Sequence, residues 1–210
     1  VTGVQTCALP ILYELGVRMM TLTWNHKNEL ASPQRNPGGV LVPQTEKGLT
    51  GKGFEFLAEM ERMHMIVDVS HLSDKGFWDI VEHGTRPFAA SHSNCRALAP
   101  HTRNLTDEMI RALSERGGIA GLNYYAPFLD TDPTHPENCR STVEMIAKHA
   151  AHYKQVGGAQ MIALGSDFDG IDGPHQLENA AFLPLLADAL RKEGFTEDEV
   201  EGIYYRNAMR

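Results

Sequence analysis

Residues 65–92 read MIVDVSHLSDKGFWDIVEHGTRPFAASH, and this stretch decides the fold. Its apolar runs at 65–70 and 87–91 predict two short buried strands. The segment 73–82 between them predicts a helix, and Gly84 just beyond it is a typical stop signal. A strand, a helix and a second strand in this order predict a βα repeat with parallel strands.

The same alternation runs through the rest of the chain. We expect further strands at 18–23, 118–124 and 161–166, helices at 50–63, 105–116, 141–156, 177–193 and 196–205, and a loop at 30–48. Thr106 is the expected N-cap of one helix, and residues 196–199 (TEDE) have a capping-box pattern. Strands alternating with helices predict an α/β fold, a partial (β/α)8 TIM barrel with about five of the eight strands.

Residues 1–11 (VTGVQTCALPI) differ in character from the sequence that follows. They match the translation of a widely used sequencing adapter, so we interpret them as a non-native leader. The alternative is a genuine N-terminus or a short signal peptide; a signal peptide fits poorly, because the segment has no basic start and no sustained apolar core. We expect a single barrel domain to occupy residues 12–210.

The composition is typical of a globular protein. The 210 residues are 42% hydrophobic and 22% charged, with a formal net charge of -8. The negative net charge argues against a nucleic-acid partner. No apolar run reaches the ~18 residues that suggest a membrane span. Three widely spaced cysteines imply no disulfide framework, so we expect a cytoplasmic protein. The assembly state stays open, with a homodimer as one candidate.

Two of the expected strands end on a histidine. His71 follows the strand at 65–70, and His92 follows the strand at 87–91. The C-terminal strand ends of such a barrel form its active site, and imidazole nitrogen is a favoured zinc ligand. A lone histidine at such a position more often bonds to loop backbone, but two at matching positions favour a metal site.

An acidic residue ends the last expected strand. Asp167 lies in GSDFDG (165–170), where its carboxylate can take a proton from a metal-bound water as general base. Asp169 is a rival as ligand, base or turn residue. Turn chemistry accounts for Asp169 and Gly170 but does not account for Asp167.

Arg103 lies in the loop after the second histidine, in the sequence HTRN. An arginine fork near a metal suits a substrate carboxylate, although most loop arginines are simply solvated. Residues 123–125 (NYY) close the fourth expected strand and either line the pocket or pack in the core.

Taken together, these segments resemble the membrane (renal) dipeptidase family, peptidase family M19. The matching stretches run in order along the chain: LYELGVRMMTLTWNH (12–26), GLTGKGFEFLAEMERMHMIVDVSHLSD (48–74), FAASHSNCRAL (88–98) with HTRN (101–104), and GSDFDG (165–170). Each motif alone has little specificity, whereas the ordered set is highly specific.

The resemblance implies a barrel of the amidohydrolase type and a zinc-dependent dipeptidase, in which a glutamate bridges a pair of zinc ions. It implies that His71 and His92 ligate the second zinc. It also implies that Arg103 holds the C-terminal carboxylate of a dipeptide, that Asp167 handles the proton of the bridging hydroxide, and that Tyr125 lines the pocket.

The sequence departs from the family pattern in three places. The His-x-Asp ligand pair of the first strand and the bridging glutamate have no counterpart, so we expect one half-site for zinc; the glutamate would fall shortly before Leu12. Trp24 stands where the family often has a histidine that polarises the substrate carbonyl. Asn25 and His26 are candidate substitutes in substrate binding.

Two alternatives remain beside the dipeptidase. An amidohydrolase acting on N-acyl amino acids or on dipeptides that contain D-amino acids would also use Arg103 for the substrate carboxylate. These 210 residues on their own are also expected to be a non-catalytic fragment, because unpaired sheet edges and a missing bridge weaken folding and zinc binding.

Overall fold

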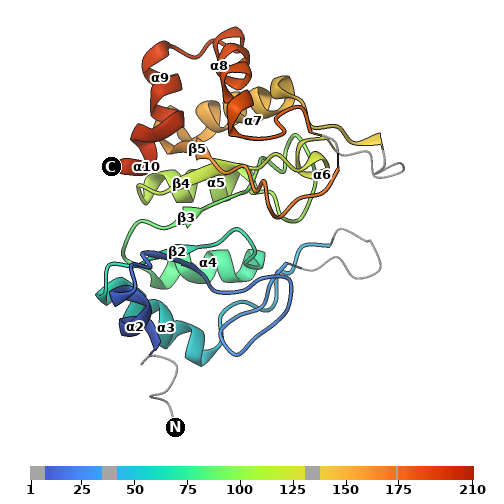
Figure 1. The fold of residues 1–210 in the computed structure, drawn as a ribbon. Coiled ribbons are helices and arrows are strands. Elements are labelled where there is room, and N and C mark those ends of the chain that lie inside the picture. Colours follow the sequence, from blue (N-terminus) through green and yellow to red (C-terminus); the bar gives the residue numbers. More distant parts are fainter. Residues whose placement is uncertain (1–7, 35–41, 131–137, 174) are drawn as a thin grey trace. The chain divides into compact units, whose positions relative to one another are not determined.

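The computed structural model describes residues 8–34, 42–130, 138–173 and 175–210. The chain divides into two compact units, Val1–Ala89 and Ala90–Arg210, which we call the N-terminal and C-terminal units. In Figure 1 the N-terminal unit runs from blue to green, and the C-terminal unit runs from green to red. Each unit combines strands with helices.

The N-terminal unit is built on two paired strands. Its elements are α2 (Ala8–Glu14), β1 (Met19–Thr21), α3 (Gly51–Arg62), β2 (Ile66–Asp68) and α4 (Asp74–His83), and β3 (Ala89–Ala90) begins at its last residue. Strands β1 and β2 are parallel, with Met19 opposite Ile66, and Asp68 at the end of β2 lies opposite Ala89. All pairings described in this unit's strands are therefore parallel.

Both long helices of this unit begin at a hydroxyl cap. Thr50 accepts a hydrogen bond from the Gly53 N–H at 3.1 Å, and Ser73 accepts one from the Gly76 N–H at 3.0 Å. Such caps satisfy backbone donors that have no partner inside the helix. The apolar faces of α3 and α4 bury Phe56, Leu57, Met60, Phe77 and Ile80.

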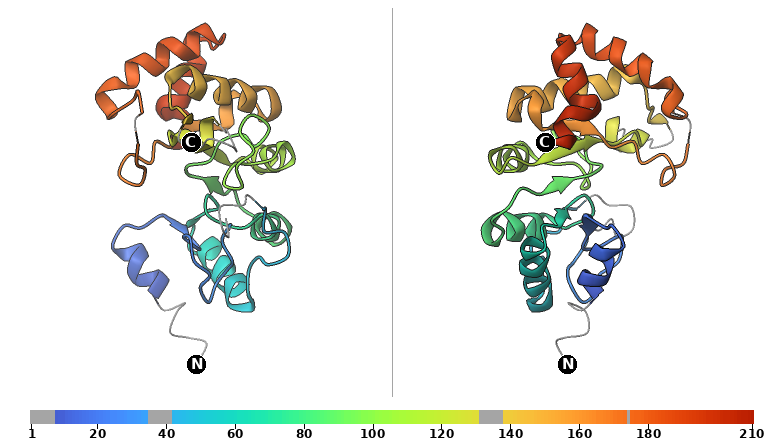
Figure 2. Two further views of the ribbon diagram at one scale, coloured as in Figure 1. Left: turned by 90° about the vertical axis from the view of Figure 1, so that its right-hand side faces the viewer. Right: turned by 60° about the vertical axis from the view of Figure 1, so that its left-hand side comes forward.

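The C-terminal unit is larger and carries most of the helices. Its elements are α5 (Asp107–Glu115), β4 (Ile119–Leu122), α6 (Ala126–Leu129), α7 (Val143–Gly157), β5 (Ile162–Leu164), α8 (Leu183–Lys192), α9 (Glu197–Glu201) and α10 (Asn207–Met209), with 3-10 turns at Ala159–Met161 and Ala180–Phe182 and a π-helical turn at Gly202–Arg206. Strands β4 and β5 are parallel. Helix α7 packs against α5 and α8, and α7 to α9 lie on one side of the two strands in every view (Figure 2).

The α/β fold expected from the sequence is confirmed, since five strands alternate with helices and the described pairings β1–β2, β2–β3 and β4–β5 are parallel. The caps are confirmed too: the Thr106 hydroxyl accepts from the Met109 N–H, and Thr196 and Glu199 form a capping box. The structure adds helix α6 and helix α2, which begins within the expected leader; the leader itself stays a prediction.

The helix expected at 177–193 begins later than the sequence suggested. Helix α8 starts at Leu183, and Pro184 lies in its first turn rather than in its interior. Proline lacks an N–H and is tolerated in a helix only where that donor would be unpaired. The preceding residues instead turn at Asn179, whose side chain accepts from the Ala181 N–H.

One histidine is a structural part of the C-terminal core. His149 is 1% exposed, its Nδ1 accepts from the Cys95 N–H at 3.1 Å, and its Nε2 donates to the Leu129 carbonyl at 3.1 Å. Burial lowers the pKa of His149 to about 4. Protonation would remove the Nδ1 acceptor, so the folded chain holds this ring neutral.

The buried ring makes stability depend on pH. Between pH 6.5 and 4 the unfolded chain protonates this group and the folded chain does not, so the free energy of unfolding falls as pH falls, by up to about 1.4 kcal/mol per pH unit. We expect His149→Gln to lower stability at pH 7 and to make this decline shallower in urea denaturation at pH 7, 6 and 5. The exposed His83→Gln is the control, and an unchanged slope in His149→Gln would contradict the assignment.

Candidate active site

The first expected site histidine lies three residues after the end of strand β2 in the N-terminal unit. His71 is 8% exposed, and its Nδ1 lies 3.1 Å from the Asn25 side-chain oxygen. An amide oxygen only accepts, so Nδ1 carries the ring proton and Nε2 bears the lone pair. Metal-bound histidines are usually oriented in this way by an acceptor on the other nitrogen.

A buried carboxylate supports this strand end. Asp68 is 2% exposed, accepts from the Thr21 hydroxyl at 2.6 Å and accepts from the Ser70 N–H at 3.1 Å. Its hydrogen bonds link Thr21, the last residue of β1, to the backbone of Ser70, which directly precedes His71. The sequence showed an acid inside an apolar strand, which is the signal that identifies it, but we did not predict a role for it.

The loop after β1 carries the next expected site residues. Trp24 is 65% exposed, and its ring centroid lies 6.1 Å from that of His26 and 6.3 Å from that of His71. His26 is exposed as well. Asn25 contacts His71, while His26 contacts Trp24.

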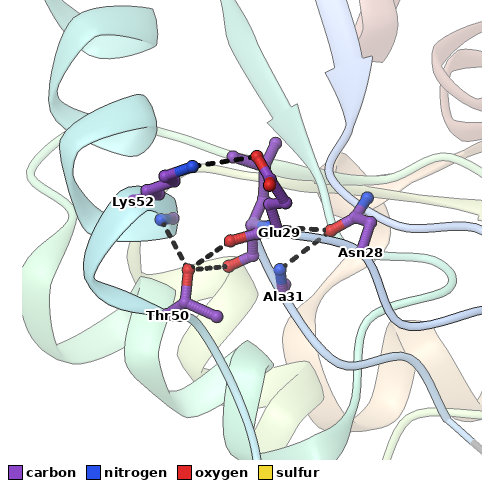
Figure 3. A network of polar contacts seen from close by, with 7 residues as sticks. Asn28, Glu29, Ala31, Thr50 and Lys52 are labelled. Carbon is purple, nitrogen blue, oxygen red and sulfur yellow. Dashed lines mark hydrogen bonds and ion pairs between the residues drawn. The ribbon is translucent and has the colours of Figure 1, made fainter. Parts of the chain in front are cut away.

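A polar network anchors this loop to the start of helix α3 (Figure 3). The Asn28 side-chain oxygen accepts from the Ala31 N–H at 3.0 Å, and the Thr50 hydroxyl donates to the Glu29 carbonyl at 2.6 Å. Lys52 and Glu29 form an exposed ion pair at 2.9 Å, which adds little by itself. The hydrogen bonds to the backbone of Ala31 and Glu29 fix the position of the loop that follows Trp24.

The second expected histidine lies just after β3 in the C-terminal unit. Nδ1 of His92 is 2.7 Å from the Ser91 hydroxyl, and Arg103 donates from Nη2 to Nε2 at 3.0 Å. A guanidinium only donates, so Nε2 is the accepting nitrogen. The lone pair that a metal would use thus faces a cationic donor.

The loop that carries Arg103 is closed at its base. The Arg96 N–H donates to the Leu105 carbonyl at 2.7 Å, and the Leu105 N–H donates to the Asn94 carbonyl at 2.8 Å. We call residues 94–105 the arginine loop. The Arg103 guanidinium carbon lies 5.4 Å from the Phe128 ring centroid, within the range of a cation–π contact.

A second neutral histidine stabilises the arginine loop from inside. Nδ1 of His101 accepts from the Arg103 N–H at 3.1 Å, and its ring packs on Phe128 with centroids 4.4 Å apart. Burial, together with the charges of Arg103 and Arg96, lowers the pKa of His101 to about 4. The ring therefore stays a hydrogen-bond acceptor at neutral pH.

Asp167 follows β5 with an unusual backbone. Its φ is 62°, in the left-handed region that aspartate tolerates better than most residues, and its carbonyl accepts from the Gly170 N–H at 2.9 Å. The Asn123 amide donates to Asp167 Oδ2 at 3.1 Å. Asp169 is exposed, which agrees with a turn role.

The tyrosines after β4 have different environments. Tyr124 is fully buried against Phe168, with ring centroids 5.5 Å apart, so core packing describes it. Tyr125 is half-buried, caps α6, donates its N–H to the Asn123 side chain at 2.6 Å and packs edge-on against Phe128. Of the two, Tyr125 is the one placed beside the arginine loop.

Two further residues of the site region were not predicted. Asn94 and Asn104 are fully buried; Asn94 lies inside the motif FAASHSNCRAL, and Asn104 ends the motif HTRN. Asparagine at a strand end is common in turns, so the motifs alone did not indicate a buried role.

Among the residues that the structure describes, one acid and histidine cluster has the spacing of a metal site. It consists of Asp79, Glu82 and His83 on α4, with ligand atoms within 4.8 Å of one another. Asp79 already pairs with Lys75 and accepts from the Leu49 N–H at 2.8 Å. It includes none of the expected site residues.

The family description "Membrane dipeptidase (Peptidase family M19)" matches residues 3–210. The chain belongs to this family. The resemblance seen in the motifs is therefore confirmed.

Two curated proteins are similar to most of this chain. An uncharacterised protein of Klebsiella pneumoniae is 37% identical over 204 residues, which is 96% of this chain and 73% of that protein. An uncharacterised dipeptidase of Schizosaccharomyces pombe is 34% identical over 200 residues, covering 94% of this chain and 46% of the relative. The chain thus spans about half to three quarters of these curated relatives.

Solved structures of the family confirm the expected fold. The crystal structure of a dipeptidase, AC, described as a metallopeptidase of family M19, matches with a TM-score of 0.86 and 32% identity, over 96% of this chain and 59% of that one. A metallopeptidase of Rhodobacter sphaeroides, liganded with a phosphinate mimic of the dipeptide L-Ala-D-Ala, matches with the same TM-score of 0.86 and 32% identity, over 96% and 56%. None of the described helices is long and apolar enough to cross a membrane.

Gly170 has no side chain, and this leaves space for the Asp167 carboxylate in this M19 chain. A Cβ at position 170 would lie 2.3 Å from Asp167 Oδ1. We expect Gly170→Ala to fold, with an unfolding free energy within about 1 kcal/mol of wild type, but to push the carboxylate off Asn123. A crystal structure checks this by the distance between Asp167 Oδ2 and Asn123 Nδ2.

The control for this change is Gly51→Ala, where a Cβ would meet nothing within 4 Å. It should leave both stability and the site unchanged. A retained Asn123–Asp167 hydrogen bond in Gly170→Ala would show that the turn adapts instead of the carboxylate.

Proposed function

We propose that this chain is part of a zinc-dependent dipeptidase that hydrolyses the peptide bond of dipeptides. Membership of a metallopeptidase family supports a metal-dependent hydrolase. The observation that carries the substrate class is the 3.0 Å contact between Arg103 and His92. If Arg103 binds a carboxylate and His92 binds the metal, this contact supports a substrate whose carboxylate lies close to the metal.

This pairing favours a short substrate with a free carboxyl terminus. A guanidinium binds a carboxylate through two parallel hydrogen bonds, which fixes its orientation as well as its position. If Arg103 holds the terminal carboxylate, the adjacent peptide bond lies only one residue away. A longer peptide would have to place its scissile bond elsewhere, so the arrangement suits dipeptides.

The hydrogen bonds of each histidine, taken by itself, are those expected of a metal ligand. We propose that His71 and His92 each supply Nε2 to zinc, because Nδ1 of each ring is matched by a neighbour, Asn25 in one case and Ser91 in the other. Zinc, when bound, lowers the pKa of a water molecule and polarises the peptide carbonyl. The charge of the imidazoles in their metal-binding form is neutral, which agrees with Nε2 of His92 acting as acceptor.

Asp167 is the proposed general base. Its Oδ2 is held by the Asn123 amide, and the other oxygen, Oδ1, is the one that faces Gly170. A carboxylate held at one oxygen can accept the proton of the attacking water at the other without rotating. Tyr125, Asn25 and His26 are the proposed pocket residues around the substrate.

The stereochemistry of the substrate is a second question. The Rhodobacter sphaeroides relative holds a mimic of L-Ala-D-Ala, so dipeptides with a D residue belong in the assay beside all-L dipeptides and N-acyl amino acids. We further propose a cytoplasmic location, on the basis of the cysteine pattern. A homodimer stays a prediction.

Chelation tests the metal. We expect the intact dipeptidase of which this chain is part to hydrolyse L-Ala-L-Ala or L-Ala-D-Ala, to lose at least about 100-fold of its rate in a chelator, and to regain it with added zinc. His71→Ala and His92→Ala should each lower the zinc content measured by atomic emission. Full activity in chelator would overturn the metal mechanism.

Arg103 tests the carboxylate clamp. Arg103→Lys keeps the charge but loses the two-pronged geometry, so we expect KM to rise about tenfold with little change in kcat. Arg86→Lys, an arginine of the N-terminal unit outside the site, is the control. Dipeptide amides, which lack the carboxylate, should be poor substrates of wild type and should be unaffected by the change; an unchanged KM for dipeptides would contradict the clamp.

A further inference from the structure

Three asparagine side chains in the C-terminal unit are fully buried, and each belongs to a loop that carries part of the proposed site. Asn94 lies two residues after His92, Asn104 follows Arg103, and Asn123 follows strand β4. All three are 0% exposed. Buried amides are costly unless their donors and acceptors are matched, so their partners are informative.

The first two asparagines close the arginine loop onto helix α6. The Asn94 N–H donates to Oδ1 of Asn104 at 3.2 Å, and Nδ2 of Asn104 donates to the Ala99 and Phe128 carbonyls, both at 2.9 Å. Nδ2 of Asn94 donates to the same Phe128 carbonyl at 3.3 Å. The loop is thereby fixed beside the ring that Arg103 rests on.

The third asparagine continues the chain to the proposed base. Asn94 and Asn123 bond reciprocally: Nδ2 of Asn94 donates to the Asn123 carbonyl at 2.9 Å, and the Asn123 N–H donates to Oδ1 of Asn94 at 3.0 Å. Nδ2 of Asn123 then donates to Asp167 Oδ2 at 3.1 Å, and its Oδ1 accepts from the Tyr125 N–H at 2.6 Å.

Only an amide of this length serves such a chain. Each link uses the side chain as donor on one side and acceptor on the other. Ionised aspartate has no donor, leucine has neither group, and a serine hydroxyl is shorter and has a single proton to donate. A satisfied buried network of this kind is rigid, because moving one member leaves several buried groups without partners.

We infer that Asn104, Asn94 and Asn123 form a positioning chain that holds the Asp167 carboxylate and the arginine loop in one fixed arrangement. The inference rests on the proposed function and adds a division of roles. Asn123 orients the group that takes the proton, and Asn104 orients the loop that binds the substrate carboxylate. None of the three contacts the reacting atoms.

This division predicts different kinetic effects at the two ends of the chain. Asn123→Ala should lower kcat about 10- to 100-fold with KM within about twofold, because the base is misplaced while the clamp is kept. Asn104→Ala should raise KM about tenfold with kcat within about threefold, because the loop carrying Arg103 loosens. Steady-state rates with L-Ala-L-Ala and L-Ala-D-Ala measure both.

The matched control is Asn207→Ala. Asn207 also donates two hydrogen bonds from its side chain, to the Ala159 carbonyl at 2.9 Å and the Ile162 carbonyl at 2.8 Å, but at the start of β5 rather than its end. It should lower stability without changing either constant. If Asn123→Ala does not fold, Asn123→Asp replaces it: this variant keeps the size and the acceptor for Tyr125 but replaces the donor with a charge that repels Asp167, so kcat should fall at least as far.

In an active protein, either of two outcomes would overturn the inference. One is that both Asn123 variants keep the wild-type kcat. The other is that kcat and KM change in the same way in Asn104→Ala, Asn123→Ala and Asn207→Ala. If the wild-type protein hydrolyses no dipeptide, the proposed function is wrong, and amide hydrogen exchange tests the positioning chain instead. Asn123→Ala should then speed amide exchange at 166–170 and Asn104→Ala at 95–105, while Asn207→Ala changes neither. Wild-type exchange rates at both places would overturn the positioning chain on its own.

Discussion

The parallel register of β4 and β5 is the constraint on which the C-terminal unit depends. Leu122 lies opposite Leu164, so both strands leave the sheet at the same level. The segments that follow the two strands therefore lie side by side, and Nδ2 of Asn123 donates to Oδ2 of Asp167 at 3.1 Å. A shift of one residue would turn Asn123 to the other face of the sheet and break this contact.

Two glycines allow the strand ends to approach as closely as this register requires. A Cβ on Gly121 or Gly165 would lie 2.0 or 2.1 Å from the Ser91 carbonyl oxygen. Ser91 precedes His92, and the Ser93 N–H donates to the Gly121 carbonyl at 2.9 Å. Because these glycines have no side chain, the backbone that precedes His92 can pack directly against the two strands that lead to Asn123 and Asp167.

The sequence predicted the parts of this arrangement that depend on local pattern. Apolar runs located all five strands, and the polar residues that follow two of them, His92 and Asp167, were predicted as site residues from their place after the strands. It could not predict Asn94 and Asn104 as buried partners, because what a loop asparagine faces depends on segments 10 to 34 residues away in the chain. Helix α6, with four residues, is too short for periodicity to indicate it.

The roles of the site residues came from the family resemblance, and the geometry adds one physical argument to them. Arg103 donates to a neutral imidazole and rests on the Phe128 ring 5.4 Å away, two contacts that are individually weak. A carboxylate is a stronger acceptor for a guanidinium than either, since both partners are charged and two bonds form together. On the proposed function, a substrate carboxylate would therefore draw Arg103 away from Nε2 of His92 and leave that lone pair to the metal. Substrate binding and metal ligation would then favour each other, because both require the same guanidinium to leave the imidazole.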